Sequence, residues 1–307
     1  DSTSALTRAA ARGEAIDSVV VNPPRRGLHP DLREALGRLR PGLCAYVSCD
    51  PETLARDLAH LSRVGFLTRR AQPYEMLPMT GHVETVVFLS PASPPPPRIL
   101  FEDDALVAID KPPHEPTTPQ GEHARSLTDR VRALPGLATA VPVHRLDAGT
   151  SGVCLFARRP DLVAPLAAAL AAGEKRYLAL VRGIIRPKGS IARPLKDEGR
   201  TLTATTRYTR RRIVGGHSLV EARPAEGRTH QIRRHLASID HAVLGDERYG
   251  HEPSNRHLSE KDALDRTFLH CARITLALAG GERTIQTPLP GDLGPEAALP
   301  VMEGKAM

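Results

Sequence analysis

The chain has 307 residues, a formal net charge of +7 at pH 7 and an isoelectric point of about 9.5. This length allows two compact domains, and the basic charge suits a polyanionic partner such as nucleic acid or a membrane surface. A membrane-spanning helix is excluded, because the longest apolar run, Leu162 to Ala172, is far shorter than the ~20 residues needed and contains Pro165. The four cysteines form no Cys-x-x-Cys pair, which argues against zinc and disulfides and predicts a cytoplasmic protein.

The first segment, residues 1–91, alternates short apolar runs with helical patterns, which predicts the closing strands of an α/β sheet. The runs are Val19–Val21, Ala45–Val47 and Thr85–Leu89. After the second run, Asp50 can cap a helix that has Pro51 at its first position. Because the chain starts at Asp1 and not at methionine, we expect this segment to be the end of a larger natural protein.

A proline-rich stretch divides the chain. Residues 90–97 read SPASPPPP, which favours a stiff polyproline II spacer, and we place the linker at residues 92–97. Residues 1–91 hold 11 Lys/Arg and 10 Asp/Glu, so the remaining 31 basic and 25 acidic residues carry +6 of the +7 charge. Affinity for a polyanion should therefore concentrate in the second domain, residues 98–307.

The second segment is rich in strand-like runs, which predicts an α+β domain with a mostly antiparallel sheet. Two helices are expected, over Asp161–Gly173 with Asp161 as its cap and over Thr229–Ile239. The strand-like runs are Ile99–Phe101, Leu106–Ile109, Val153–Phe156, Tyr177–Val181 and Ser218–Ala222.

A carboxylate is displayed just before one of these strands. The segment HRLDAGTSG, residues 144–152, is rich in turn formers and precedes the apolar run Val153–Phe156. Asp147 could act chemically from such a loop. It could equally form a local Asx-type turn in which its side chain bonds neighbouring amides.

The wider segment HRLDAGTSGVCLFA, residues 144–157, resembles the signature of the RluA-type pseudouridine synthases. Three further segments match this family in the expected order: residues 174–183 its tyrosine motif, residues 226–233 its arginine motif and residues 244–250 its closing motif. The resemblance spans residues 98–290. It implies a pseudouridine synthase fold and the isomerisation of specific uridines in ribosomal or transfer RNA.

The resemblance also implies roles for individual residues. Asp147 is the expected catalytic aspartate, Tyr177 packs against the target uracil, Arg228 pairs with Asp147, and Arg145 fills the gap left by the flipped nucleotide. The aspartate could serve as a nucleophile at C1′ or as a base that removes a sugar proton. Tyr177 could alternatively be a core aromatic residue. Arg233, predicted to lie on a helix, could contact RNA phosphates or belong to a solvated face.

The family reaction requires no cofactor, which agrees with a sequence that lacks a glycine-rich phosphate loop and metal-ligand spacings. His144 and His230 are interpreted as hydrogen-bonding residues and not as metal ligands or catalytic groups. The expected partner is structured RNA with an exposed uridine, because the target base must leave its stack. We expect no membrane and no metal partner.

The first domain carries a second resemblance. Residues 19–27, 46–57 and 82–86 are together similar to the C-terminal part of the SAM-dependent RNA uracil-C5 methyltransferases. In that family, the residue corresponding to Cys49 adds to uracil C6 and the one corresponding to Glu84 removes the C5 proton. A thiolate at the start of a helix is chemically suited to this task. Alternatively, Cys49 is an ordinary buried cysteine and Glu84 a surface strand residue.

Two departures weaken a methyltransferase activity. Asn22 stands where that family has aspartate, and the glycine-rich SAM loop expected upstream is absent from this sequence. SAM is therefore an expected cofactor only if the upstream methyltransferase half is present. The leading hypothesis is an RNA pseudouridine synthase that carries the end of a methyltransferase-like domain. The alternatives are methylation as the main activity of a longer protein, or a catalytically dead RNA-binding module.

Overall fold

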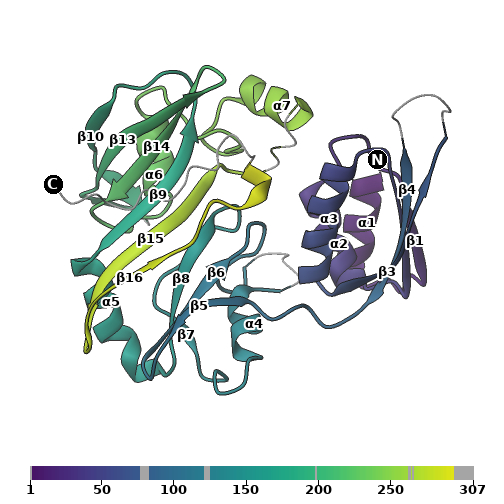
Figure 1. The fold of residues 1–307 in the computed structure, drawn as a ribbon, viewed down its shortest axis with the longest axis horizontal. Coiled ribbons are helices and arrows are strands. Elements are labelled where there is room, and N and C mark those ends of the chain that lie inside the picture. Colours follow the sequence, from purple (N-terminus) through teal and green to yellow (C-terminus); the bar gives the residue numbers. More distant parts are fainter. Residues whose placement is uncertain are drawn as a thin grey trace. The chain divides into compact units, whose positions relative to one another are not determined.

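Figure 1 shows a computed structural model of the chain, which describes residues 2–76, 83–120, 125–197, 199–261, 264 and 266–293. The chain forms two compact units, each with its own hydrophobic core. Unit 1 comprises Asp1–Pro96 and Pro119–Ser126, and unit 2 comprises Pro97–Thr118 and Leu127–Met307. Within the described part of the chain, no helix is long and apolar enough to cross a membrane.

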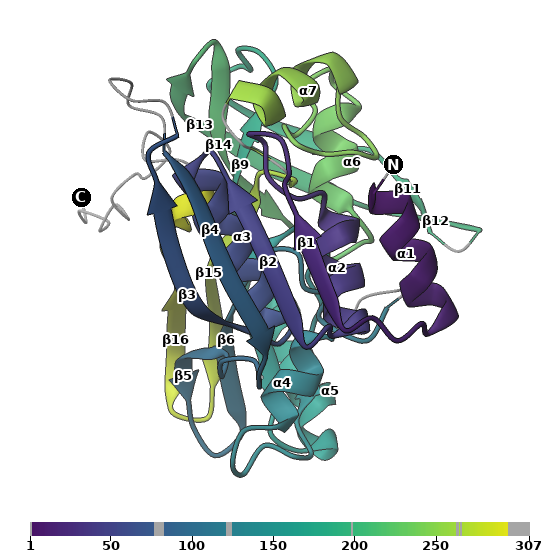
Figure 2. The same cartoon turned by 90° about the vertical axis from the view of Figure 1, so that its right-hand side faces the viewer.

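Unit 1 is a four-stranded sheet with helices packed on one face. The strand order is β1-β2-β4-β3, with β1 and β2 parallel and the other pairs antiparallel. Figure 2 shows these strands side by side, with α2 and α3 behind them. The strands are β1 (Ser18–Val21), β2 (Leu43–Ser48), β3 (Phe66–Tyr74) and β4 (Glu84–Pro91), and the helices are α1 (Ser2–Arg12), α2 (Pro30–Leu39) and α3 (Pro51–Arg63). The predicted partial α/β character of this segment is confirmed.

The strands of unit 1 form because apolar residues alternate along them. In β1, Val19 and Val21 are buried, whereas Val20 between them is 74% exposed. Helix α3 begins where expected, because the Asp50 carboxylate accepts a 2.8 Å hydrogen bond from the Thr53 amide. This cap fixes the end of β2 against the start of α3.

Unit 2 is built on a large mixed sheet. Its strands run in the order β10-β13-β14-β9-β15-β8-β6-β5, with β16 beside β15 and β7 beside β8. Among the described strands of this sheet only β8 and β15 pair in parallel, so the predicted mostly antiparallel α+β domain is confirmed. The strands are β5 (Arg98–Glu102), β6 (Leu106–Lys111), β7 (Val141–Pro142), β8 (Ser151–Ala157), β9 (Glu174–Val181), β10 (Lys188–Ala192), β13 (Thr205–Val214), β14 (His217–Pro224), β15 (Leu269–Leu278) and β16 (Gly281–Gln286), and β11 (Leu195–Asp197) and β12 (Arg200–Leu202) form a separate pair.

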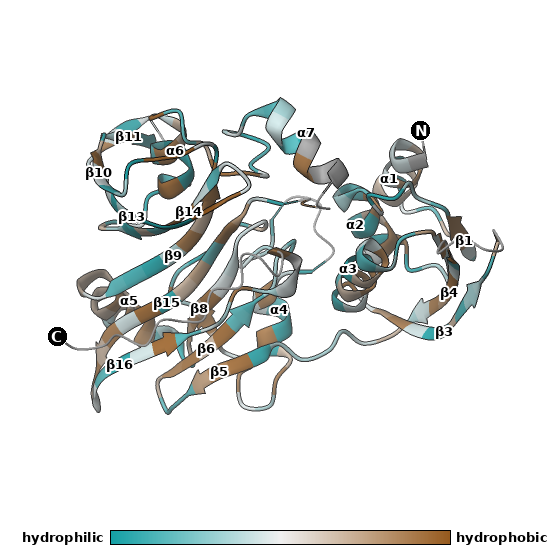
Figure 3. Cartoon of the chain, turned by 45° about the horizontal axis from the view of Figure 1, so that its top comes forward, coloured by the Kyte–Doolittle hydropathy of each residue, from teal (hydrophilic) through white to brown (hydrophobic). Residues whose placement is uncertain are grey.

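The core of unit 2 lies along the central strands. Every residue of β8 is buried, and Figure 3 contrasts the apolar middle of the sheet with the hydrophilic start of β9. The helices are α4 (Leu127–Arg132), α5 (Val163–Ala172), α6 (Gln231–Ala237) and α7 (Glu252–Lys261), with short 3-10 turns at Pro160–Leu162 and Gly291–Leu293.

Two expected helices differ from the structure. The helix predicted from Asp161 starts at Val163 without a side-chain cap, because the Asp161 carboxylate pairs with Arg159. The helix predicted from Thr229 starts at Gln231, because His230 adopts a left-handed backbone conformation with φ 52°. Both errors are local, since a capping residue type does not reveal which partner its side chain takes.

Gly152 places the end of the HRLD loop against the sheet. It has φ 115°, and a Cβ at this position would lie 2.3 Å from the backbone oxygen of Cys271. Glycine therefore permits β8 to approach β15 closely, where Gly152 pairs with Cys271. The same cysteine pairs with Tyr177 of β9. The loop, β9 and β15 consequently meet at one place.

Candidate active site

Asp147 lies in a turn that is closed by the backbone. Its carbonyl oxygen accepts a 3.0 Å hydrogen bond from the Thr150 amide. The neighbouring Leu146 is buried, and its amide and carbonyl both bond the Thr117 hydroxyl at 2.9 Å. The Asp147 carboxylate points away from these groups and pairs with an arginine. The structure thus favours a displayed carboxylate over the alternative of a local Asx-type turn.

The arginine that pairs with Asp147 is Arg233. Its Nη1 donates a 2.8 Å hydrogen bond to Asp147 Oδ2, while its Nε and Nη2 donate to Asp246 Oδ2 and Oδ1 at 2.6 and 2.8 Å. The Asp246 side chain is fully buried, and that of Arg233 is 10% exposed. Burial opposes the charge of Arg233, but the hydrogen bonds that it donates to both carboxylates, together with their charges, outweigh burial and raise its pKa.

Two predicted assignments are corrected by this geometry. Arg228 was expected to pair with Asp147, but its Nε donates to the Thr203 carbonyl at 3.3 Å, and no contact among the described residues joins it to the aspartate. Arg233 was expected on a solvated or RNA-binding surface, but it is buried between two carboxylates. Both arginines lie in the same motif, so the sequence pattern could not tell which of them faces the loop.

The turn that follows Asp246 holds the carboxylate that pairs with Arg233. Its Oδ1 accepts hydrogen bonds of 3.0 Å from the amides of Arg248 and Tyr249. Burial would raise the pKa of Asp246, but the hydrogen bonds and charge of Arg233, together with these amides, lower it. Asn255 of α7 also clamps this turn, since its amide accepts from Gly245 and donates to the Asp246 carbonyl, both at 2.9 Å. Arg233 thus pairs with a carboxylate whose position is fixed by several hydrogen bonds.

Tyr177 is buried beside the aspartate. Burial raises the pKa of its phenol well above the ordinary value, Cys271 raises it further, and the charge of Asp147 adds to the effect. The phenol therefore stays protonated at neutral pH. Its position in β9 makes it part of the core and also brings it near Asp147, so the two interpretations of this residue are compatible. Contact with a uracil remains a prediction.

Lys111 is a site residue that the sequence did not reveal. It is fully buried at the end of β6, and its Nζ donates to the carbonyls of Pro112, Ala148 and Thr150 at 2.9, 3.2 and 2.7 Å. Two of these carbonyls, those of Ala148 and Thr150, follow Asp147 in the same loop. Burial lowers the pKa of Lys111 to about 7, against the opposing charge of Glu115. A lone lysine before a proline gives no signal in the sequence, because its burial depends on the fold.

His144 and Arg145, the first two residues of the HRLD segment, differ in their exposure. His144 is half-buried, and its Nε2 accepts a 3.2 Å hydrogen bond from the Leu155 amide. Burial, followed by the charge of Lys175, lowers the pKa of His144 to about 4, so its ring is neutral. His144 is thus a hydrogen-bonding residue, as expected. Arg145 is exposed on the loop next to Asp147, and its contact with RNA stays a prediction.

In unit 1, the two methyltransferase-like residues lie at one end of the sheet. Strands β2 and β4 are antiparallel with Ser48 opposite Thr85, so Cys49 and Glu84 continue the same register. Cys49 follows β2 and directly precedes Asp50, the cap of α3, and both Cys49 and Glu84 are half-buried. His82, which belongs to the same predicted motif, lies outside the described residues.

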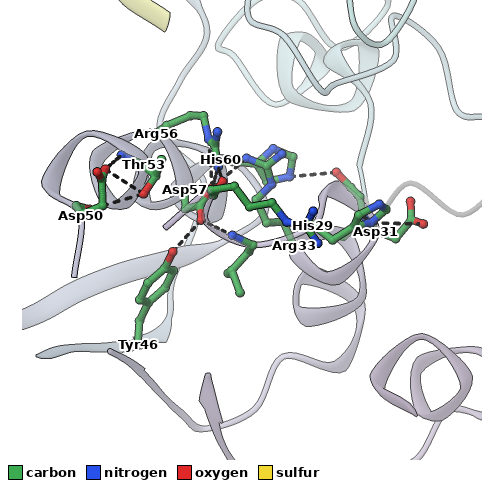
Figure 4. Close-up of polar contacts among 12 residues, drawn as sticks. His29, Asp31, Arg33, Tyr46, Asp50, Thr53, Arg56, Asp57 and His60 are labelled. Atoms are coloured by element: carbon green, nitrogen blue, oxygen red, sulfur yellow. Dashed lines mark hydrogen bonds and ion pairs between the residues drawn. The ribbon is translucent and has the colours of Figure 1, made fainter. Parts of the chain in front are cut away.

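A buried ion cluster holds the loop that contains Asn22. Asp57 accepts hydrogen bonds from the Arg33 guanidinium at 2.9 Å, the Tyr46 hydroxyl at 2.6 Å and the Leu28 amide at 2.6 Å (Figure 4). Arg56 donates to the carbonyl of Arg26 at 2.6 Å. These contacts tie α2, α3 and β2 to the loop after β1.

The loop after β1 in unit 1 is held by contacts with α3. The loop after β1 is occupied by its own protein contacts, since the Thr53 hydroxyl bonds the Arg25 carbonyl at 2.8 Å and Asp57 bonds the Leu28 amide. Gly27 in this loop has φ 81°, and a Cβ at this position would lie 2.4 Å from Arg56 Nη2 and 2.6 Å from Asp57 Oδ2.

Potential metal ligands do not gather in the described parts of the chain. No group of three or more His, Cys, Asp or Glu side chains there is arranged to hold a metal ion. His230 approaches Asp147, but its other ring nitrogen faces the Tyr249 hydroxyl. The site of unit 2 therefore consists of charged and hydrogen-bonding side chains.

Comparisons with known proteins relate the two parts of the chain to two families. Residues 105–238 match the family model described as RNA pseudouridylate synthase, and residues 10–92 match the one described as tRNA (Uracil-5-)-methyltransferase. A tRNA pseudouridine synthase C of Haemophilus ducreyi is 34% identical over 204 residues, which cover 56% of this chain and 82% of the relative. A ribosomal large subunit pseudouridine synthase D of Zymomonas mobilis is 30% identical, over 64% of this chain and 70% of the relative.

The two units differ in how much of their relatives they cover. An uncharacterized RNA methyltransferase of Clostridium acetobutylicum is 47% identical over 78 residues, but the chain spans only 17% of its length.

The solved structure of human RNA pseudouridylate synthase domain containing 4 shares the fold, with a TM-score of 0.53 and 23% identity over 62% of this chain and 88% of that one. The chain belongs to the RNA pseudouridine synthase family, whose members are isomerases that act on RNA.

Proposed function

We propose that this chain isomerises specific uridines of ribosomal or transfer RNA to pseudouridine, with Asp147 as the catalytic carboxylate. The observation that carries the proposal is the chain of ion pairs from Asp147 to Arg233 to Asp246. The names of the two relatives described above refer to transfer RNA and to the large ribosomal subunit, so both classes of RNA are candidate substrates.

The ion pair supplies what the chemistry needs. The bond from C1′ to uracil N1 breaks, the base turns, C5 bonds to C1′, and C5 loses its proton while N1 gains one, so no atom is gained or lost. Attack of a carboxylate on C1′ and removal of a sugar proton both require Asp147 to be ionised. Arg233 supplies a positive charge 2.8 Å from Asp147 Oδ2, beside the carboxylate that the reaction requires.

The surroundings of Asp147 suit an extruded base. The Asp147 side chain is 29% exposed, so a flipped uridine can reach it, and the neighbouring Tyr177 and Leu146 are buried and apolar in character. Arg145 is exposed on the same loop, and its proposed role is to occupy the space that the base leaves in the RNA. The proposed partner is structured RNA, the reaction uses no cofactor, and the proposed location is the cytoplasm.

The test uses RNA that carries tritium at uracil C5, because both pseudouridine formation and C5 methylation release this label. The intact chain is compared with Asp147→Asn and Cys49→Ser, each with and without SAM. We expect release without SAM that is lost in Asp147→Asn and retained in Cys49→Ser.

Other outcomes identify the alternatives. Release that depends on SAM and Cys49 would assign the activity to unit 1 and contradict the proposal. Binding of RNA by a folded chain, with no release from unmodified tRNA and rRNA transcripts, would favour a non-catalytic RNA-binding module.

A further inference from the structure

His230 occupies a strained position at the edge of the candidate active site. It immediately precedes α6, with φ 52° and ψ 29°, in the left-handed region that residues other than glycine seldom adopt. Its side chain makes no capping hydrogen bond with the helix. A residue held in this region requires support from its surroundings, and such residues cluster at functional sites. The side-chain contacts of His230 show what that support is.

Both ring nitrogens of His230 face groups of the site. Nδ1 lies 3.1 Å from the Tyr249 hydroxyl, and Nε2 lies 3.6 Å from Asp147 Oδ1. The other oxygen of Asp147, Oδ2, is bonded by Arg233. Residues at the start of one short helix therefore approach the two oxygens of the carboxylate separately.

Tyr249 is fixed by the same turn that supports Arg233. Its amide donates to Asp246 Oδ1 at 3.0 Å, the guanidinium carbon of Arg233 lies 5.3 Å from the centre of its ring, and the ring meets that of His230 edge-on at 5.6 Å. The turn thus holds Arg233 through Asp246 and His230 through Tyr249. His230 therefore has its own hydrogen-bonding partner in this turn, as Arg233 has in Asp246.

The charge state of His230 determines which nitrogen can donate. Burial lowers its pKa, and the nearby Arg233 and Arg248 lower it further against the opposing effect of Asp147. The ring is therefore neutral at pH 7 and above and carries one proton. When the Tyr249 hydroxyl donates to Nδ1, that proton lies on Nε2, which faces Asp147.

We propose that His230 is a positioning residue for pseudouridine formation, which donates from Nε2 to Asp147 Oδ1 and is held in this tautomer by the Tyr249 hydroxyl. The inference rests on the proposed function of Asp147. The separation of 3.6 Å shortens to a hydrogen bond when RNA closes the site, as is common for catalytic contacts in ligand-free enzymes. Arg233 holds Oδ2 of the carboxylate, and His230 fixes its rotation through Oδ1.

The first arm of the test measures single turnovers on unmodified tRNA and rRNA transcripts labelled with tritium at uracil C5. We expect Tyr249→Phe and His230→Asn to slow the chemical step about tenfold, as the loss of one hydrogen bond implies, and to leave the dissociation constant of the RNA unchanged. Asparagine tolerates the left-handed backbone, so the second variant removes the contact without new strain. Tyr208→Phe on β13 is the matched control and should react like the unaltered chain.

The second arm observes the tautomer directly by nitrogen-15 NMR of the histidine-labelled intact chain. The signal missing from His230→Asn identifies His230, and we expect its proton on Nε2 in the unaltered chain and a mixture of tautomers in Tyr249→Phe. A proton on Nδ1 in the unaltered chain would overturn the proposal whatever the kinetics show.

The two arms separate this inference from the proposed function. If the unaltered chain and Asp147→Asn release tritium equally, the role of Asp147 is wrong and the inference fails with it. If Asp147→Asn is inactive but Tyr249→Phe and His230→Asn react at the unaltered rate, the proposed function stands and His230 is not a positioning residue. Weaker RNA binding with an unchanged chemical step also overturns the inference.

Discussion

Arg233 binds Asp246 through two parallel hydrogen bonds of 2.6 and 2.8 Å, and this pairing leaves its Nη1 free to reach Asp147. A bidentate pair of this kind fixes the plane of the guanidinium as well as its charge. The position of the third donor is therefore set by a carboxylate that does not contact Asp147. We expect the site to depend on the shape of the arginine and not on its charge alone.

Replacing Arg233 by lysine tests that dependence. Lysine keeps the positive charge but cannot bond Asp246 and Asp147 in one plane. We expect Arg233→Lys to lower the single-turnover rate by about two orders of magnitude, which corresponds to the loss of a buried charged contact. Arg234→Lys, on the same helix but bonded to the Lys196 carbonyl, is the control and should retain most of the activity. Equal activity of both variants would contradict the assigned role.

The buried lysine predicts a pH dependence of stability. The folded pKa of Lys111 is lowered to about 7, below the value of about 10.5 that applies when the chain is unfolded. The unfolded state therefore binds more protons between these values, and the contribution of Lys111 to stability rises with pH through this window and is lost as pH falls through 7. We expect the free energy of unfolding of the unaltered chain to increase relative to that of Lys111→Met when the pH is raised from 7 to 8.5. Urea unfolding at both pH values measures it, and a constant difference would show that Lys111 stays charged.

Gly152 predicts a severe packing defect. An alanine there would combine a left-handed φ of 115° with a methyl group 2.3 Å from the Cys271 carbonyl oxygen. Because that oxygen belongs to the backbone of the paired strand, neither strand can yield without breaking the sheet. We expect Gly152→Ala to destabilise the chain by about 3 kcal/mol or more in chemical denaturation. Gly291→Ala, where a methyl group meets open space, should change stability by less than about 1 kcal/mol.

The ion cluster of unit 1 predicts a separate stability effect. Asp57→Asn would leave the fully buried guanidinium of Arg33 facing a neutral amide, in place of the carboxylate 2.9 Å away. Removing one partner of a buried ion pair typically costs about 3–5 kcal/mol. We expect faster proteolysis within residues 1–91. Asp31→Asn, where the carboxylate is 70% exposed, should not change the cleavage rate.

Local patterns were sufficient for much of the architecture. Alternation of apolar residues identified the strand around Val19, and the residue types at Asp50 and Pro51 identified the start of α3, because these signals act within a few residues. The HRLD segment likewise pointed to Asp147, since a carboxylate among turn formers before an apolar strand is a local feature. The same reasoning misjudged the start of the helix near Asp161, where the side chain had another local partner in Arg159.

The tertiary structure decided which distant groups meet. Arg233 lies 86 residues from Asp147, and nothing within its own helix distinguishes it from a solvated arginine or from Arg228 as the partner of the carboxylate. The burial of Lys111 depends on carbonyls that follow it by 37 and 39 residues. By itself the sequence determined the elements, the family resemblance and the carboxylate, because these follow from neighbouring residues. The electrostatic environment of that carboxylate forms only in the folded domain, since it is made by groups that are far apart along the chain.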